Sequence, residues 1–546
     1  MKQKILTFGE EARKALKRGV DQLADAVQTT MGPKGRNVLV QRDYGRAKIS
    51  KDGKYVASSI KLKDPIEARG AELLQEAAEK TDDVVSDGTT ATTVITRAIV
   101  TEGLKSLSAG INPLLIKRGL DKAKDAVIEF VKKSAKDSVT EDDIRRIASI
   151  SANDPKIGDI IASMIQEIGR TSIITVKESQ KPGVETECVK GFRIDKGYYS
   201  QYMINDVEKM QTVLDDIQVF MTDGKLTNVR QVVSIVEPLA QAGKRFGVII
   251  CEDITADALS FLAANILQGK FFTLVIKAPG YGEQKNEMLK DLSAVSGAKM
   301  HIHETGKKLE DNKVDISEFG VFDRIVCTRD YTTFIGGHGK QEDVDARVES
   351  IRTMISRADS KIDTTRLNDR LSKLLGGIGV INVGGNTDVE TKELLHRVED
   401  AVGSTKAAIE GGYVSGGGLA LVEAANSESL VDLQGTLCEE EAVGVAILKK
   451  ALKYPMKVIA ENAGFNGEVV IGKVEQNILE GADGVKNYGF DALNCAYTDM
   501  IEAGIIDPAK VVISALENAV SVASLILTTE CVITDDASDK KVEEEM

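Results

Sequence analysis

The chain has 546 residues, 42% of them hydrophobic and 28% charged, a composition typical of a folded protein of about three or four domains rather than of a disordered chain. The 70 basic and 84 acidic residues give a net charge of −14, which argues against general binding of nucleic acid or anionic membranes but allows a local phosphate site. Six widely spaced cysteines and four histidines indicate reduced thiols and argue against a disulfide framework or a zinc site.

The first part of the chain, to about residue 136, is predicted to be mainly helical. Apolar residues recur at helical spacing between Ala12 and Val27, and the N-terminus is expected to enter this helical pattern within a few residues. The helix ends at the breaker sequence Met31-Gly32-Pro33-Lys34-Gly35. Short β-like segments at 37–40 and 47–50 precede the turn Lys51-Asp52-Gly53, and helical patterns return at 66–81 and 89–107.

The middle of the chain, from about residue 191 to 376, alternates short β-rich runs with helices, as α/β domains do. Strands are predicted at 247–251, 271–276 and 324–327, and helices at 229–242 and 256–268. A strand at 378–383 then leads to a helix at about 388–410, and the remainder is helical. We therefore predict a multidomain α and α/β protein, whose mostly helical ends form one domain with the α/β segment inserted between them. No apolar run approaches the ~20 residues that cross a bilayer, and neither a secretory nor a transit peptide is evident.

The strongest local feature is Ser86-Asp87-Gly88-Thr89-Thr90-Ala91-Thr92, directly before an apolar helical run. Unpaired N–H groups and the dipole at a helix N-terminus attract phosphate, and Asp87 could hold a magnesium ion that screens phosphate charge. The segment is not a Walker A loop, because the Gly-Lys-Ser/Thr ending is missing. For this segment taken alone, an ordinary Asp N-cap followed by threonines in the first turn, a common capping arrangement, is the favoured interpretation.

Asp400 is a second acidic candidate. It lies opposite the apolar face of its predicted helix, so a solvated surface acid is the simpler interpretation. Carried over a bound phosphate by a hinge, the same carboxylate could position water for in-line attack. Glycine pairs near 376 and 411 are candidate hinges or ordinary loop residues, and Gly416-Gly417-Gly418 permits close approach of the backbone to a ligand or packs a helix start.

Two helices of the middle segment carry more apolar surface than packing on one side requires. The apolar residues of the first helix cover about 160° of its circumference. Such extra apolar surface on both helices indicates either an exposed binding patch or, equally, burial between two layers. The residues concerned are Val232, Val233, Ile235, Val236 and Leu239 on the first helix, and Leu259, Leu262, Ala263 and Ile266 on the second.

An ordered set of motifs resembles the group I chaperonins, the GroEL family of bacteria and organelles, over about residues 4–534. These motifs are Leu23-Ala24-Asp25-Ala26-Val27, Met31-Gly32-Pro33-Lys34-Gly35-Arg36-Asn37, Asp87-Gly88-Thr89-Thr90, Ile150-Ser151-Ala152-Asn153, Lys277-Ala278-Pro279-Gly280, Arg397-Val398-Glu399-Asp400, Gly416-Gly417-Gly418 and Gly504-Ile505-Ile506-Asp507-Pro508.

The resemblance implies an equatorial domain (1–136 and 412–546), an intermediate domain (137–190 and 377–411) and an α/β apical domain (191–376). It further implies rings of seven subunits, single or double, that hydrolyse ATP with Mg²⁺ and K⁺ and fold unfolded or misfolded polypeptides under a small GroES-like co-chaperonin ring. No nucleic acid or membrane partner is expected. The implied location is the bacterial cytoplasm, or a mitochondrion-related organelle matrix if a transit peptide is absent or removed.

The resemblance also implies roles for individual residues. Asp52 and Asp400 would orient the attacking water, and Asp87 would bind magnesium. The nucleotide would contact Thr30, Met31, Gly32, Pro33, Lys51, Asp87, Gly88, Thr89, Thr90, Ala91, Gly417, Asp491, Ala492, Leu493 and Asp507. Clients and the co-chaperonin would bind Tyr198, Tyr202, Met203, Val233, Val236, Leu259, Ala263 and Ala264, and the hinges would be Gly191, Gly377 and Gly412.

Departures from the family pattern put parts of this expectation in question. Ser86 and Ala91 replace Gly and Thr beside Asp87, and Asp491-Ala492-Leu493 replaces Asn-Ala-Ala. The first apical helix contains Pro238, the second carries small residues at Ala263 and Ala264, and the chain ends in acidic residues instead of Gly-Gly-Met repeats. A divergent paralogue that assembles and binds polypeptide with weak or no ATPase cycling is therefore the alternative. A small-molecule phosphotransferase is disfavoured, because no acceptor site or catalytic base motif stands out.

Overall fold

A computed structural model describes residues 4–41, 47–169, 173–207, 209–280, 282–302, 309, 314–357, 366–367, 370–371, 373–374, 377–480 and 487–535. The chain divides into two compact units. The helical unit comprises Met1–Ser163, Glu178–Val184 and Val383–Met546, and the α/β unit comprises Met164–Lys177 and Glu185–Asn382. The expected insertion of an α/β segment between helical ends matches this division, whereas a separate intermediate domain stays a prediction. The acidic tail lies outside the described residues.

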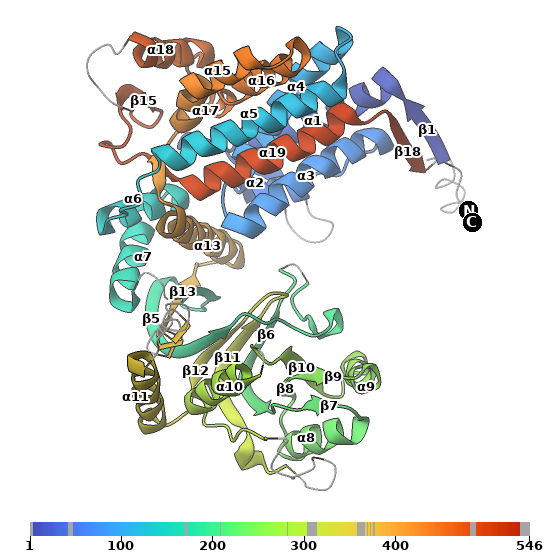
Figure 1. The fold of residues 1–546 in the computed structure, drawn as a ribbon, viewed down its shortest axis with the longest axis vertical. Helices are drawn as coiled ribbons and strands as arrows, with labels where there is room; N and C mark the ends of the chain where they lie inside the picture. Colours follow the sequence, from blue (N-terminus) through green and yellow to red (C-terminus); the bar gives the residue numbers. More distant parts are fainter. Residues whose placement is uncertain are drawn as a thin grey trace. The chain divides into compact units, whose positions relative to one another are not determined.

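Long helices lying side by side form the core of the helical unit (Figure 1). They are α1 (Gly9–Gln28), α3 (Pro65–Val85), α4 (Thr89–Ser108), α5 (Pro113–Ser134), α16 (Glu439–Ala451) and α19 (Ala509–Thr528). Their buried residues are mostly Ala, Val, Leu and Ile, in keeping with the few aromatics of the sequence. Helix starts follow local rules: Asp64 and Asn112 cap α3 and α5, and a proline follows each cap.

Glycines allow two pairs of these helices to approach closely. A Cβ atom on Gly19 of α1 would lie 1.9 Å from the carbonyl oxygen of Glu67 in α3, and a Cβ atom on Gly70 of α3 would lie 2.1 Å from the carbonyl oxygen of Leu16 in α1. Each helix therefore contributes a glycine where the other helix's backbone comes closest. Gly119 of α5 and Gly444 of α16 form a second such contact. These four glycines therefore serve helix packing.

Helix α19 is the most apolar of these helices. Its mean hydropathy of 1.8 and its length would allow it to cross a membrane, contrary to the expectation that no segment approaches this limit. The apolar window is 61% buried within the protein, however, and twelve of the helix residues are buried. Since core helices pass the same length and composition test, α19 is accounted for by packing on α3, α4 and α5.

Smaller elements complete the helical unit. The helices are α2 (Gly53–Ser58), α6 (Glu141–Ala152), α13 (Asp388–Gly411), α14 (Leu419–Ala425), α15 (Glu428–Thr436), α17 (Tyr454–Asn462) and α18 (Gly467–Glu480), and α7 (Pro155–Ile168) spans the unit boundary. The two-stranded sheets pair β1 (Lys4–Phe8) with β18 (Cys531–Asp535), β2 (Val38–Val40) with β3 (Lys48–Ser50), β14 (Tyr413–Ser415) with β17 (Ile506–Pro508) and β15 (Tyr488–Asp491) with β16 (Ala496–Asp499).

The N-terminal segment corrects one expectation. Residues 4–8 form a strand instead of entering a helical pattern, because their partner β18 lies at the other end of the chain, where Lys4 pairs with Asp535. The predicted β-like segments at 37–40 and 47–50 are confirmed as β2 and β3, and the helix predicted at 388–410 is confirmed as α13.

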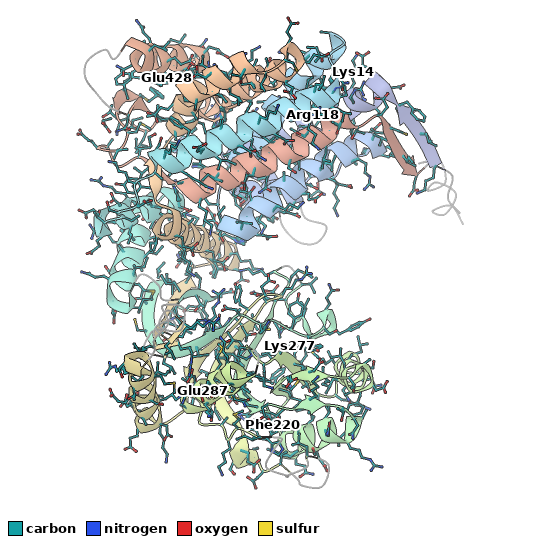
Figure 2. All side chains as sticks on the ribbon, viewed as in Figure 1. Lys14, Arg118, Phe220, Lys277, Glu287 and Glu428 are labelled. Carbon is teal, nitrogen blue, oxygen red and sulfur yellow. The ribbon has the colours of Figure 1, made fainter. Side chains whose placement is uncertain are left out.

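An eight-stranded sheet forms the α/β unit, in the order β10-β8-β6-β11-β12-β5-β13-β4. Its strands are β4 (Ile173–Glu178), β5 (Gly183–Ile194), β6 (Thr212–Met221), β8 (Phe246–Cys251), β10 (Phe272–Lys277), β11 (Gly320–Cys327), β12 (Thr332–Gly337) and β13 (Gly377–Gly384), and a small sheet pairs β7 (Lys225–Leu226) with β9 (Asp253–Ile254). The helices are α8 (Val229–Gln241), α9 (Ala256–Leu267), α10 (Glu283–Ser296) and α11 (Gln341–Arg357), with short 3-10 turns at Gln201–Met203 and Ile316–Glu318. Phe220, labelled in Figure 2, is fully buried in the core of this unit.

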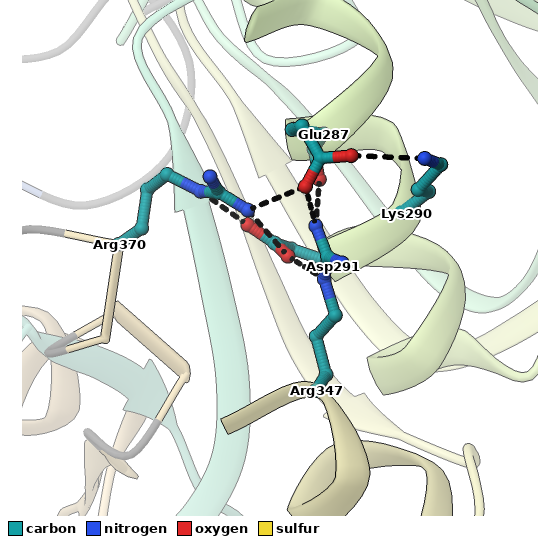
Figure 3. Close-up of polar contacts among 5 residues, drawn as sticks. All are labelled: Glu287, Lys290, Asp291, Arg347 and Arg370. Carbon is teal, nitrogen blue, oxygen red and sulfur yellow. Dashed lines mark hydrogen bonds and ion pairs between the residues drawn. The ribbon is translucent and has the colours of Figure 1, made fainter. Parts of the chain in front are cut away.

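An ionic network fastens α10 to α11 and to Arg370 within this unit (Figure 3). The Asp291 side chain is 0% exposed and accepts from Arg347 Nε at 2.5 Å and from Arg370 Nε at 2.8 Å. Glu287 pairs with both arginines and with Lys290. Although burial opposes its ionisation, Lys290 and Arg347 hold the pKa of Glu287 down to about 2. The Glu287 carboxylate therefore stays charged and paired at neutral pH.

Candidate nucleotide site

The N-terminus of α4 has no side-chain cap. Its N-cap residue is Gly88, in the left-handed region at φ 82°, and no side chain accepts from the first-turn amides. Asp87 is not the N-cap: its Oδ1 accepts from the N–H of Gly88 at 2.6 Å. The ordinary Asp-cap interpretation is therefore wrong. The amides that begin α4, beside the hydroxyls of Thr89 and Thr90, are a suitable binding site for an anion.

The start of α2 packs directly against this helix N-terminus. A Cβ atom on Gly53 would lie 2.3 Å from Oγ1 of Thr90 and 3.1 Å from Oγ1 of Thr89. The preceding residue, Asp52, caps α2 by accepting from the N–H of Lys54 at 2.8 Å. The structure thus brings Asp52 and Lys51 to the same place as Thr89 and Thr90. Burial and the charge of Arg397 both lower the pKa of Lys51.

Helix α13 contributes Asp400 to the same place. Burial raises the pKa of Asp400 well above its ordinary value, and the carboxylates of Asp87 and Asp52 raise it further. Asp400 is only partly accessible to solvent, so its interpretation as a solvated surface acid is wrong. Asp507 joins the group: burial and the charge of Asp87 raise its pKa to about 7. We call Asp52, Asp87, Asp400 and Asp507 the acidic cluster.

Two serines, which the sequence analysis did not select, hold Asp87. Ser404 of α13 donates to Oδ2 of Asp87, and Ser151 of α6 donates to the same oxygen at 3.3 Å. The two hydroxyl oxygens lie 3.1 Å apart. Burial raises the pKa of Asp87, and the hydrogen bonds from Ser404, Gly88 and Ser151 act in the opposite direction. Ser151 lies in a family motif quoted above, whereas nothing in the local sequence marked Ser404.

The acidic cluster is suited to a divalent cation. Within the described ranges no lysine or arginine forms an ion pair with any of its four members, and burial and their mutual repulsion raise the pKa of Asp400. The described residues also hold no group of three His, Cys, Asp or Glu side chains placed to bind a metal alone. An ion held by one or two carboxylates plus phosphate oxygens and water, the usual arrangement for Mg²⁺, matches both observations.

The loop of Thr30, Met31, Gly32 and Pro33 follows α1 and is held by α17. Asn462 donates to the carbonyl oxygens of Gln28 and Met31, both at 2.9 Å. Gly32 has φ +82° and packs against Ile459. Asn462 was missed by the sequence analysis, because no local signal links it to a loop more than 400 residues away.

The glycine joint before α14 lies beside Asp507. The N–H of Gly417 donates to the carboxylate of Asp507. The joint directly follows β14, and β14 pairs with β17, the strand that contains Asp507. Gly417 has φ +64°, a backbone conformation that other residues rarely adopt, and a Cβ atom there would meet only the flexible end of Met500, at 2.8 Å, so the backbone conformation is what favours glycine. Gly417 and Asp507 therefore lie together, and their contact with a nucleoside stays a prediction.

The three nucleotide-contact residues expected at 491–493 have different environments. Asp491 is buried and its carboxylate accepts from the N–H groups of Leu493 and Asn494, so it shapes its own hairpin. Ala492 is buried in a small apolar core, and Leu493 is 62% exposed. The next residue but one, Cys495, accepts a 2.7 Å contact from Nζ of Lys34, which links this hairpin to the loop after α1.

The expected client-binding residues lie in the α/β unit and divide by burial. Val232, Ile235 and Leu239 are core residues, so the wide stripe of α8 is mainly explained by burial. Met203 is also fully buried, which corrects its assignment to an exposed face. The residues that keep accessible surface are Tyr198, Tyr202, Val233, Val236, Leu259, Ala263 and Ala264. Leu267, 73% exposed at the end of α9, was missed.

The three expected hinge glycines have different environments. Gly191 lies inside β5, where a Cβ atom would lie 1.9 Å from Cδ1 of Ile378, so tight packing already explains this glycine. Gly377 begins β13. Gly412 ends α13 at φ +73°, where a Cβ atom would lie 2.7 Å from the carbonyl oxygen of Lys136. A hinge role for any of them stays a prediction.

The fold is that of a chaperonin. The structure is similar to that of the chaperonin gp146 from the bacteriophage EL 2 (Pseudomonas aeruginosa), solved in the presence of ATP-BeFx, with a TM-score of 0.68 and 20% identity over 97% of this chain and 99% of that one. Residues 23–537 match the TCP-1/cpn60 chaperonin family, and the chain belongs to this family.

Proposed function

We propose that the chain is a group I chaperonin that binds and hydrolyses ATP, with Mg²⁺ and K⁺, to fold polypeptides enclosed in a ring. The observation that carries the proposal is the meeting of Asp52, Asp87 and Asp400 at the uncapped N-terminus of α4. Acids from three separate parts of the chain gather here beside donors for phosphate, and no ion pair to a lysine or arginine is described for any of the three. Phosphoryl transfer needs this combination of charge and positioning.

In this proposal each group at the site has a separate role in ATP hydrolysis. The first-turn amides of α4 and the hydroxyls of Thr89 and Thr90 bind phosphate oxygens. Asp87 holds the magnesium ion, which when bound screens phosphate charge. Asp52 and Asp400 orient the attacking water and accept its proton, for which the raised pKa of Asp400 suits it as a base. Gly417 and Asp507 contact the nucleoside.

Exposed apolar residues on two small sheets of the helical unit support self-association into rings of seven subunits, single or double. Leu6, Phe8 and Ile533 on β1–β18, and Leu39 and Ile49 on β2–β3, are each more than half exposed. Two-stranded sheets also leave unpaired backbone edges that a second chain can extend. Such surface is costly in a monomer and is removed from water by assembly.

Clients and a GroES-like co-chaperonin ring would bind the accessible apolar residues of α8, α9 and the 3-10 turn at Tyr202. Unfolded chains share hydrophobicity but no sequence, so non-directional apolar contacts suit them. The cytoplasm of a bacterium, or an organelle matrix, is the proposed compartment.

The decisive experiment measures ATP turnover with magnesium and potassium, with and without a co-chaperonin, together with refolding of a model client. We expect turnover of wild-type protein and ATP-dependent recovery of the client. The matched control is Asp400→Ala, which should bind ATP and client but release little folded product. Client binding without any ATP turnover in the wild type would refute the proposal and favour a scaffold that does not cycle.

A further inference from the structure

The helix α13 carries two side chains toward the acidic cluster, one helical turn apart. Asp400 and Ser404 are spaced i, i+4, so they project from the same face of the helix. Ser404 is 0% exposed and its hydroxyl reaches Oδ2 of Asp87, 317 positions away in sequence. The contact therefore joins α13 to the loop that precedes α4.

The same oxygen of Asp87 also accepts from Ser151 of α6, so three elements converge on one atom. The other oxygen, Oδ1, accepts from Gly88. An ionised carboxylate offers about four acceptor positions, so these donors orient the group and still leave it able to bind a metal ion.

We propose that Ser404 is a positioning residue for ATP hydrolysis, one whose hydrogen bond to Asp87 fixes α13 in the place that holds Asp400 in the acidic cluster. The inference rests on the proposed function. Asp400 and Asp87 repel one another where they meet, and repulsion favours movement of α13 away from α4. The hydroxyl of Ser404, donating to Asp87 one turn further along the helix, opposes that movement.

The first test needs no nucleotide and follows unfolding by urea. Asp400→Asn removes the repulsion and should stabilise the protein when Ser404 is present. In the Ser404→Ala variant the helix can already move away from Asp87. Adding Asp400→Asn to that variant should therefore change the unfolding equilibrium constant by a factor about fivefold smaller than the factor it produces in the wild type. Thr405→Val is the matched control, because it removes a buried hydroxyl that bonds only within α13, to Ala401. Equal effects of Asp400→Asn in all three backgrounds would overturn the inference.

The second test separates binding from turnover. Ser404→Ala should lower kcat about tenfold or more while the affinity for ATP, measured by calorimetry, changes less than threefold. Ser404→Cys keeps a weaker donor and should recover part of kcat, whereas Thr405→Val should resemble the wild type. Unchanged kcat in Ser404→Ala would overturn the inference and leave the proposed function standing. Absence of turnover in the wild type would refute the proposed function, and the urea test would then decide the positioning of Asp400 by itself.

Discussion

Gly403 of α13 lies against Ser86, the residue that precedes Asp87: a Cβ atom on Gly403 would lie 2.4 Å from Cβ of Ser86. The close approach of α13 to the end of α3 therefore requires glycine at position 403. Ser86 is itself in the left-handed region at φ 53°, as the C-cap of α3. The departure from the family pattern at Ser86 is thus accommodated by the small residue opposite it.

Gly403→Ala should push α13 away from Asp87. Overpacking at a fixed contact costs about 1–3 kcal/mol, and we expect a lower urea midpoint together with a loss of ATP turnover that exceeds the loss of ATP binding. Adding Ser86→Gly should restore both properties, because it removes the side chain that the new methyl group meets and suits the left-handed backbone. Gly435→Ala, where the added methyl group meets nothing within 4 Å, is the control. Failure of the double variant to recover would contradict this account.

Asp400→Ala should reduce ATP turnover by orders of magnitude while ATP binding stays near normal, because the acid is proposed to act on water and not on the nucleotide. Calorimetry gives the affinity, and release of inorganic phosphate gives the turnover. Glu393→Ala removes an exposed carboxylate from the same helix and should change neither quantity. Equal losses of binding and turnover in Asp400→Ala would argue for a structural role instead.

Stability should depend on pH through Asp507. Burial and the charge of Asp87 raise its pKa from 3.8 to about 7, so the folded state binds more protons than the unfolded state between these values. Stability without nucleotide and magnesium therefore falls as pH rises from about 4 to about 7, by at most ~1.4 kcal/mol per pH unit from this group, and is level above.

Asp507→Asn removes the titrating group but keeps an acceptor for the N–H of Gly417. Its urea midpoint should fall less than that of the wild type between pH 5 and pH 8. Parallel pH profiles for the two proteins would exclude Asp507 as the source.

The ionic network of the α/β unit should be costly to break. Arg347→Ala leaves the fully buried Asp291 paired with Arg370 but with half of its compensating charge removed, and we expect a loss of about 3 kcal/mol, since breaking a buried ion pair is expensive. Lys290→Ala removes a half-exposed partner of Glu287 and should cost less than about 1 kcal/mol. Thermal unfolding followed by circular dichroism compares the two. Similar small losses would show that Arg370 alone sustains the network.

Client binding should depend on the exposed side chains of the α/β unit. Val233→Ser and Tyr202→Ser each remove exposed apolar surface and should weaken binding of a denatured model client several-fold, without altering basal ATP turnover. Val431→Ser, at an exposed valine of α15 in the helical unit, is the control. Fluorescence anisotropy of a labelled client measures the affinity. Equal weakening by the control variant would count against a specific client-binding face.

Most of the secondary structure, and the helix start at Gly88, could be predicted from the sequence, because both depend on neighbours along the chain. Helical periodicity and the Gly-Pro break placed α1, and strand–helix alternation placed β8, α8, α9 and β10 within two residues of their observed bounds. The Asp87-Gly88-Thr89-Thr90 motif was likewise recognisable, since a helix N-terminus is a local feature.

Which acids meet could not be predicted from the sequence and depends on the tertiary fold. Periodicity alone favoured a solvated Asp400, because a helix projection shows what is polar and not what lies opposite it. The contacts that define the site, such as Ser404 with Asp87 and Asn462 with the carbonyl oxygen of Met31, join residues more than 300 positions apart. The strand β1 and the burial of most of the α8 stripe depend on equally distant partners. Such pairings arise from packing of whole elements, which no local pattern of residues specifies.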